Sequence, residues 1–387
     1  MKQIAYFSIF LALAACGERT QMASELLVAD KNVDCPTQEI YLEDIADVDY
    51  IPLVTTDSIL VNDYPPESVT PEGIAVRGGQ PGELLLLDPT GQKLVGRVCR
   101  CGQGPEEYTV IYRCFVDWQR REVYIADYTQ LKVYDFAGNY LRTLLTKEEM
   151  VILDIHNLNA DQLLCARERE NCETPYHPYF TLSKADGRVD TLTSIEVPRF
   201  IASNRTILWD DGSSNKAYGY LPLLVGCADR TWLTAPALDT IFQINPDRSL
   251  LPVMAPLRAP TREEEAPLLH FRGINDRYIW LSWVRRNVTV RMRDMEAGLQ
   301  EGTHIYLYDR KAQTWCEPVY RCRAWSGFEP RYIFTDPLPY GYGLVMLNAM
   351  DLVEAYQNDE LADERLREIA STLREDDNPV LMRLKFK

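Results

Sequence analysis

The sequence predicts an all-β protein: a six-bladed β-propeller that is closed by N- and C-terminal strands and carries a short C-terminal helical insertion. Three observations lead to this prediction. A unit of three short strands recurs along the chain, its first copies start 39 positions apart, and strand-like segments without a unit of their own stand near both ends. A period near 40 is typical of propellers, whereas a β-sandwich does not explain the repeated spacing.

The segment Val123–Leu145 shows the repeated unit most clearly. It contains the strand-like runs VYIAD, LKVYDF and YLRTLL, with a turn at Ala137–Asn139 before the third run and no helical period. Three short antiparallel strands cannot bury both of their faces alone. They need neighbours of the same kind on each side, as in an array of stacked repeats.

Four further copies of the unit follow the same order of strand, strand, polar turn and strand. They begin at Leu84–Asp88, Gln162–Ala166, Thr231–Ala235 and Tyr278–Ser282. Insertions near 199–226, 284–303 and 321–340 interrupt the later spacing. The chain therefore has five complete units.

A sixth blade is expected to form from both ends of the chain. The early strand Tyr50–Leu53 has no unit of its own, and neither do the late strands Gly343–Leu347 and Val380–Phe386. Joining these strands would remove the open edges of the ring. The charged segment 351–376 has apolar residues at helical spacing, with Asp359 as a plausible helix N-cap, so we expect a helix there within a propeller domain of residues 37–387.

The N-terminus predicts export and a lipid anchor. Residues 1–15 have a positive Lys2 and a short apolar run, which is typical of a signal peptide. The run ends in Leu-Ala-Ala-Cys, and this ending resembles the bacterial lipobox, in which the Cys, here Cys16, is acylated with a lipid such as palmitate. Residues 16–36 then form a lipidated tether. The lipid bilayer is the expected partner of Cys16, and the location is the cell envelope, on a membrane face that the sequence leaves open.

Charge and cysteine content narrow the choice of partners. The formal net charge of −16 disfavours binding to nucleic acid, because an acidic surface repels phosphates.

Nine cysteines remain beside Cys16, without a regular spacing. Buried structural thiols are the first expectation, and a disulfide between Cys316 and Cys322 or between Cys165 and Cys172 is the alternative.

Several separate segments together resemble one family, the six-bladed β-propeller lipoproteins of Bacteroidota, which are distantly similar to NHL-repeat propellers. The segments that carry the resemblance are Asp49–Leu53 with Thr55–Asp57, Gly102–Tyr108, the D-x-x-G turn at 135–138, and Asp376–Leu381. Glu106 stands where the family usually has Gly. The resemblance implies the fold and an exported lipoprotein, and it implies no settled activity.

No motif for catalysis, metal binding or a cofactor stands out. The run Gly102–Pro105 lacks the pattern of a phosphate-binding loop and is better explained as a turn between blades. The four histidines, His156, His177, His270 and His304, form no HxH or HExxH motif. We therefore expect no catalytic residue, no metal site and no cofactor, and regard an enzyme as the less favoured class.

Aromatic residues in the interrupting loops are the candidate ligand-binding residues. They are Tyr176, Tyr179, Trp209, Tyr218, Tyr220, Trp325 and Phe328. Aromatic side chains among polar ones suit stacking on sugars or anchoring a protein, but they can equally act as plugs at the ends of blades. If they bind a ligand, the loops should gather on one face of the propeller.

These observations favour an exported, lipid-anchored binding or scaffolding module of the cell envelope. Its partner would be an envelope protein, a carbohydrate or a peptide. Two alternatives remain open: a propeller hydrolase or lyase with a metal in the central channel, and a structural component of an outer-membrane uptake or signalling complex.

Overall fold

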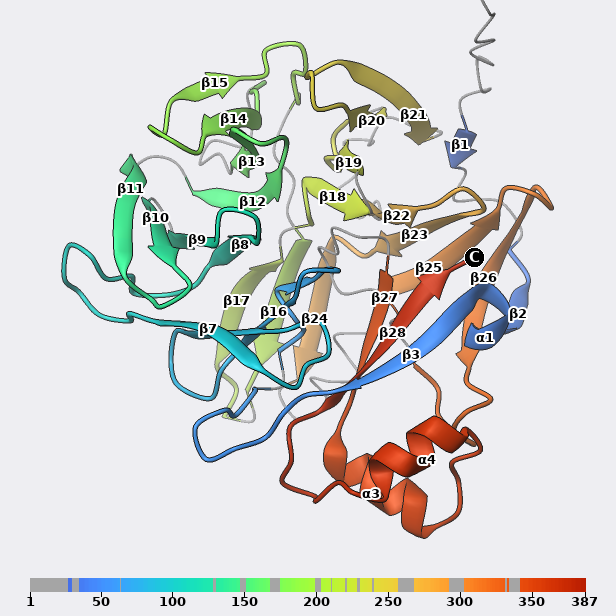
Figure 1. Ribbon diagram of the computed structural model, residues 1–387. Helices are drawn as coiled ribbons and strands as arrows, with labels where there is room; N and C mark the ends of the chain where they lie inside the picture. The colour runs from blue at the N-terminus through green and yellow to red at the C-terminus, as the bar shows by residue number, and fades with distance from the viewer. Residues whose placement is uncertain are drawn as a thin grey trace, which may run out of the picture.

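The computed structural model describes most of the chain after the leader. The described residues are 27–29, 35–62, 64–127, 130–146, 151–167, 175–198, 203–209, 211–219, 221–227, 230–238, 240–256, 268–291, 303–330, 333 and 342–387. Cys16 and the signal peptide lie outside these residues. The described chain forms a six-bladed β-propeller, and the blades follow one another around a ring in Figure 1.

The first three blades are four-stranded antiparallel sheets. Blade one contains β4 (Ser68–Val69), β5 (Ile74–Arg77), β6 (Glu83–Leu87) and β7 (Leu94–Cys99). Blade two contains β8 (Arg113–Asp117), β9 (Glu122–Asp127), β10 (Gln130–Asp135) and β11 (Tyr140–Thr146). Blade three contains β12 (Ile152–Asn157), β13 (Gln162–Arg167), β14 (Tyr179–Ser183) and β15 (Val189–Thr191). The strands predicted from the repeated unit are confirmed in all three blades.

Blades four and five each gain a fifth strand from the N-terminal part of the chain. Blade four contains β18 (Leu224–Cys227), β19 (Arg230–Leu233), β20 (Ile241–Ile244) and β21 (Leu250–Pro256), with β1 (Leu27–Ala29) added in parallel to β21. Blade five contains β22 (Leu268–Ile274), β23 (Tyr278–Val284), β25 (Thr303–Asp309) and β26 (Thr314–Arg321), with β2 (Thr37–Tyr41) added in parallel to β26. Part of the segment expected to be a tether is thus a strand.

The sixth blade is closed by the two ends of the chain, as the sequence predicted. It consists of β27 (Tyr342–Leu347), β28 (Val380–Phe386) and β3 (Ala46–Pro52), with β28 in the middle. The short helix α1 (Leu42–Ile45) joins β2 to β3. Among the described residues this sheet has three strands. The Leu344 amide donates to Ile333 O at 3.0 Å on the side of β27 away from β28, so β3 is the outer strand of the blade.

Two of the three insertions form a small separate sheet. The hairpin of β16 (Ser203–Leu208) and β17 (Ser214–Gly219) pairs in parallel with β24 (Asn287–Arg291), which leaves blade five after β23. In the view of Figure 1 this sheet lies near the middle of the ring. Pairing between segments about eighty residues apart was not evident in the sequence.

The predicted helical segment 351–376 is two short helices rather than one. Helix α3 (Ala349–Gln357) ends at Asn358, and Asp359 adopts a left-handed conformation with φ of 58°. Helix α4 (Glu364–Ala370) begins after Asp363, whose side chain accepts a hydrogen bond from the Leu366 amide at 2.8 Å. Asp363, and not Asp359, is therefore the N-cap of the second helix. Both helices lie outside the ring, beside the sixth blade (Figure 1).

Hydrophobic clusters between neighbouring blades hold the ring together. The cluster between blades one and two includes Leu86, Val98, Val116 and Tyr134, all less than 5% exposed. Blades five and six share a larger cluster with α3 and α4, which includes Trp280, Met382 and Leu366. Because each blade is covered on both sides, its strands read as nearly continuous apolar runs such as Leu84–Leu87.

Candidate binding groove beside the closing blade

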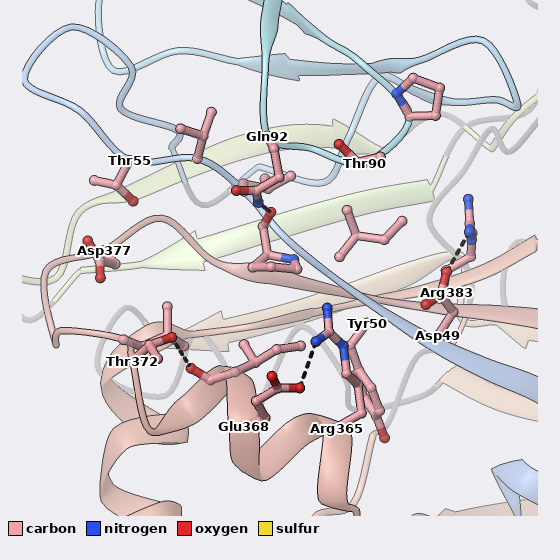
Figure 2. A pocket seen from close by; sticks show the side chains of 17 residues that line it. Asp49, Tyr50, Thr55, Thr90, Gln92, Arg365, Glu368, Thr372, Asp377 and Arg383 are labelled. Atoms are coloured by element: carbon pink, nitrogen blue, oxygen red, sulfur yellow. Dashed lines mark hydrogen bonds and ion pairs between the residues drawn. The ribbon is translucent and has the colours of Figure 1, made fainter.

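A surface groove of about 770 Å³ runs along β3 at the sixth blade. Its floor is β3 and the residues after it, and its two walls are α4 and the turn between β6 and β7 (Figure 2). The residues that line it are Asp49, Tyr50, Ile51, Pro52, Leu53, Val54, Thr55, Pro89, Thr90, Gln92, Arg365, Glu368, Ile369, Thr372, Leu373, Asp377 and Arg383. Three parts of the chain that are distant in sequence thus meet here.

The floor of the groove is the outer strand of the sixth blade. Leu53 N donates to Pro379 O at 3.2 Å and Lys387 N donates to Ile45 O at 2.9 Å, so the odd-numbered residues of β3 face β28. In an antiparallel pair the alternate residues point their backbone groups the other way. Val48 and Tyr50 therefore direct their N–H and C=O groups away from β28, to the side without a further strand of this sheet.

One wall is the exposed face of α4. Leu366, Ile369 and Ala370 form the buried face of this helix, where they join the core of blades five and six. The opposite face carries Arg365 and Glu368, which form a hydrogen-bonded ion pair at 2.8 Å. The spacing of three residues places both side chains on one face of the helix. They lie beside β3 in Figure 2.

The other wall is the turn Asp88–Lys93, which approaches β3 closely. The Asp88 carboxylate accepts hydrogen bonds from the amides of Gln92 and Lys93 at 2.9 and 3.0 Å. Gly91 has a φ of 72°, and a Cβ there would come within 2.9 Å of the Pro52 carbonyl oxygen. Glycine thus permits both the turn and the approach. As a result the Gln92 side-chain amide reaches Pro52 O and donates to it at 2.6 Å.

A buried asparagine fixes the end of the floor. Asn378 is 4% exposed, and its side-chain amide donates to the carbonyls of Val54 and Ile59 at 2.7 and 2.9 Å. Its side-chain oxygen accepts from Val61 N at 2.8 Å. All of its side-chain groups thus hold the segment after β3 in one conformation, which gives the groove a preformed floor.

The charged side chains of the groove largely neutralise one another. Arg383 pairs with Asp49 at 2.5 Å, Arg365 pairs with Glu368, and Asp377 is held by Arg374 at 3.4 Å. Between these pairs lies the half-buried side chain of Leu373, beside the small exposed part of Ile369, which is 6% exposed. Paired charges around an apolar strip suit recognition of a polypeptide better than attraction of a small ion.

The aromatic residues singled out from the sequence do not lie in this groove. Tyr176 and Tyr179 are 5% and 0% exposed and belong to the core between blades three and four, where the Tyr179 hydroxyl donates to Thr234 O at 2.9 Å. Trp325 is 8% exposed and stacks on Phe328, with ring centroids 4.6 Å apart. The buried rings of Tyr176, Tyr179 and Trp325 thus offer little surface to a ligand, whereas Phe328 is partly exposed.

The other three candidates belong to the inserted hairpin. Trp209 is 39% exposed at the end of β16. Tyr218 lies in β17, and its backbone pairs with Asn204 of β16. The side chain of Tyr218 and the whole of Tyr220 lie outside the described parts of the structure. Trp209 is therefore the one candidate with a demonstrated exposed ring.

Sequence reasoning did not identify the groove, although one signal pointed to it. Pro52 ends the strand β3 and has no N–H to donate, which is typical of an edge strand or a strand end. The segments Asp49–Leu53 and Asp376–Leu381 also carried much of the family resemblance. The structure brings both segments together at this groove, which their separation of more than three hundred residues concealed.

His156, Cys165, Cys316 and Cys322 are buried in the propeller. His156 in β12 is 5% exposed, and burial lowers its pKa from 6.5 to about 4. Cys316 and Cys322 are both buried free thiols, so the alternative of a disulfide between them is wrong. Cys165 is also a buried free thiol, and Cys172 lies outside the described residues.

Among the described residues there is neither a metal-binding group of side chains nor a membrane-spanning helix. No group of three or more His, Cys, Asp or Glu side chains within them is arranged to hold a metal ion. No helix in the described part of the chain has the length and hydrophobicity needed to cross a membrane.

The fold and the closing blade place this chain among six-bladed propellers completed by strands from both ends. Its sequence matches the model of the domain of unknown function DUF4934 over residues 26–385. The chain therefore belongs to the DUF4934 family. A search of curated protein sequences gave no match.

Solved structures from Bacteroides resemble this fold. A Bacteroides fragilis NCTC 9343 protein described as exported is similar with a TM-score of 0.59 and 13% identity, over 91% of this chain and 98% of that one. A member of the duf4221 family from Bacteroides vulgatus has a TM-score of 0.47 and 10% identity, over 89% of this chain and 97% of that one. At 13% identity, the similarity to the Bacteroides fragilis protein shows a shared fold and no more.

Proposed function

We propose that this protein is an exported, lipid-anchored binding module of the cell envelope, and that the groove along β3 is its binding site for a partner protein. The groove is the observation that carries the proposal. Its floor is preformed by Asn378 and its charges are already paired, so a partner that enters it does not need to reorganise the site. Preorganisation of this kind lowers the cost of binding.

The sequence supports the proposed location. The lipobox-like ending at Cys16 follows a signal peptide, and acylation there would tether the propeller to a membrane. A tethered propeller would search for a partner along the membrane surface only, and not through the whole volume of the envelope. Binding at a groove on the rim of the ring, next to the helices α3 and α4, leaves the other blades free for further contacts.

Affinity purification from native membranes tests the proposal. Wild-type protein should retain a partner at a fixed ratio. Thr372→Trp places a large ring in the groove from an exposed position of its wall, and it should abolish recovery of that partner. Glu364→Trp is the matched control, because it puts the same ring on an exposed position of α4 that does not line the groove. Recovery of no partner, or equal recovery with all three proteins, contradicts the proposal.

A further inference from the structure

The outer strand of the sixth blade, β3, carries no added strand among the described residues. Blades one to three have four strands each, and blades four and five have four strands plus one added in parallel. In blade six the Leu344 amide donates to Ile333 O at 3.0 Å, so a further segment lies on the side of β27 away from β28, and β3 holds the outer position that β21 and β26 hold in blades four and five. The groove runs along the outward edge of β3, on the side where blades four and five each carry an added strand. The place of the groove in the fold therefore suggests the shape of its occupant.

We propose that the occupant is an extended segment of the partner protein, which adds to β3 as a further outer strand of the sixth blade. This inference rests on the proposed function and specifies how the groove binds. The outward N–H and C=O groups of Val48 and Tyr50 offer a strand-pairing edge that leads into the groove. Pairing with a sheet edge supplies main-chain hydrogen bonds, while the walls select side chains.

The chain itself shows that the outer strands of this propeller accept added strands. β1 pairs with β21 over Leu27–Ala29, and β2 pairs with β26 over Thr37–Tyr41. Both added strands come from a segment far away in sequence and not from the blade's own repeat. A partner segment on β3 would repeat this arrangement at the next blade around the ring.

Gln92 already occupies one acceptor on the proposed edge. Pro52 is even-numbered, so its carbonyl faces outward like those of Val48 and Tyr50, and the Gln92 side-chain amide donates to it. This contact imitates the hydrogen bond of an incoming strand. Pro52 itself donates nothing, so the edge supplies two N–H groups, from Val48 and Tyr50.

The walls define the chemistry of the segment. Successive residues of a strand point to opposite sides. On one side the segment would meet the apolar side chains of Ile369 and Leu373 on and after α4, and on the other it would meet the polar turn with Thr90 and Gln92. The segment is therefore expected to alternate apolar and polar residues and to carry little net charge.

Selection from a phage-displayed library of linear heptapeptides tests the inference without knowledge of the natural partner. Wild-type protein should enrich peptides with alternating apolar residues. A selected peptide, made synthetically, should lose affinity about tenfold or more when alternate backbone nitrogens are methylated, because methylation removes the donors that a strand needs. Methylation of the nitrogens between them, which face away from β3, should have a much smaller effect.

Two protein variants locate the binding edge. Val48→Pro removes an outward N–H without touching a bond to β28, and it should weaken binding of the selected peptide about tenfold. Val189→Pro is the matched control: Val189 is a half-buried valine in the edge strand β15, and it faces away from β14 in the same manner. It should leave the affinity unchanged.

The outcomes separate this inference from the proposed function. If no peptide is enriched, or if Val48→Pro and the methylated peptides bind as tightly as their parents, strand addition is refuted. If the native partner is still lost with Thr372→Trp but retained with Val48→Pro, the groove binds a partner by another mode and only the proposed function stands. Circular dichroism of both proline variants checks that they remain folded.

Discussion

At the scale of single residues, buried polar side chains join neighbouring blades. Lys184 after β14 is 2% exposed, and its ammonium group donates to Asp117 of blade two at 2.7 Å and to Asn157 at 2.8 Å. A buried ion pair stabilises little relative to an apolar pair, but losing one partner leaves an uncompensated charge. Removing one partner of such a pair therefore lowers the free energy of unfolding by more than the intact pair contributes.

Replacing Lys184 with Met should lower the free energy of unfolding by about 3–5 kcal/mol, because Asp117 would remain buried without its cation. Urea denaturation followed by circular dichroism measures this change. The double variant Lys184→Met with Asp117→Leu should recover much of the loss. A single variant as stable as the wild type would show that solvent or Arg120 compensates Asp117.

His156 should make stability depend on pH. The folded protein protonates this residue only near pH 4, whereas an unfolded chain does so near 6.5. The unfolded state thus takes up the proton first as the pH falls, and the contribution to stability is lost from 6.5 down to 4. Between about pH 7.5 and 5 the wild type should lose about 2 kcal/mol more than His156→Phe. Equal losses in denaturant titrations of the two proteins would contradict this.

At the scale of elements, β28 decides whether the ring closes. It lies between β27 and β3, and so it joins the last part of the chain to the first. Its alternate side chains pack into different cores: Leu381 belongs to the cluster shared with blade one, and Met382 to the cluster shared with blade five. Neither end of the chain can complete the sixth blade alone.

Truncating Leu381 to Ala should therefore destabilise the protein by about 2–5 kcal/mol, because this fully buried side chain leaves a cavity between blades six and one. Lys385→Ala, at an exposed position of the same strand, should change stability by no more than about 0.5 kcal/mol. Chemical denaturation of the two variants compares them directly. A small effect at Leu381 would mean that β28 contributes little to closure.

At the scale of the whole molecule, the anchor and the groove are properties of different parts of the chain. The propeller fold depends on the described residues, whereas membrane attachment is proposed to depend on Cys16. Substitution at Cys16 should therefore change location without changing the fold. The acidic net charge of −16 offers no second means of holding the protein on an anionic membrane.

Cys16→Ala should release the protein from the membrane fraction of expressing cells, because the acceptor of the lipid is lost. Cys101→Ala changes an exposed thiol of the propeller and should leave the protein in the membrane fraction. Fractionation with immunodetection measures both. An unchanged membrane fraction for Cys16→Ala would refute the lipid anchor.

The sequence by itself determined the repeating architecture. The unit at Val123–Leu145 and the spacing of 39 predicted the blades, because each blade repeats one local pattern of strands and turns. The D-x-x-G turn at Asp135–Gly138 was predicted for the same reason: Gly138 has a φ of 80°, and Asp135 accepts hydrogen bonds from Ala137 N and Asn139 N. Closure of the ring by Tyr50–Leu53 and Val380–Phe386 was predicted because these two strands belong to none of the five repeated units.

Only the tertiary structure decided which distant segments meet. The burial of Tyr176 and Tyr179, the pairing of β16 with β24, and the addition of β1 and β2 to outer strands depend on contacts between blades that leave no local pattern. The groove depends most on such contacts between distant segments. Its floor is Asp49–Thr55, its helical wall is Arg365–Leu373, and its turn is Pro89–Gln92. Local periodicity specifies a strand, but the outward edge of β3 and the two walls of the groove come together only once the ring has closed.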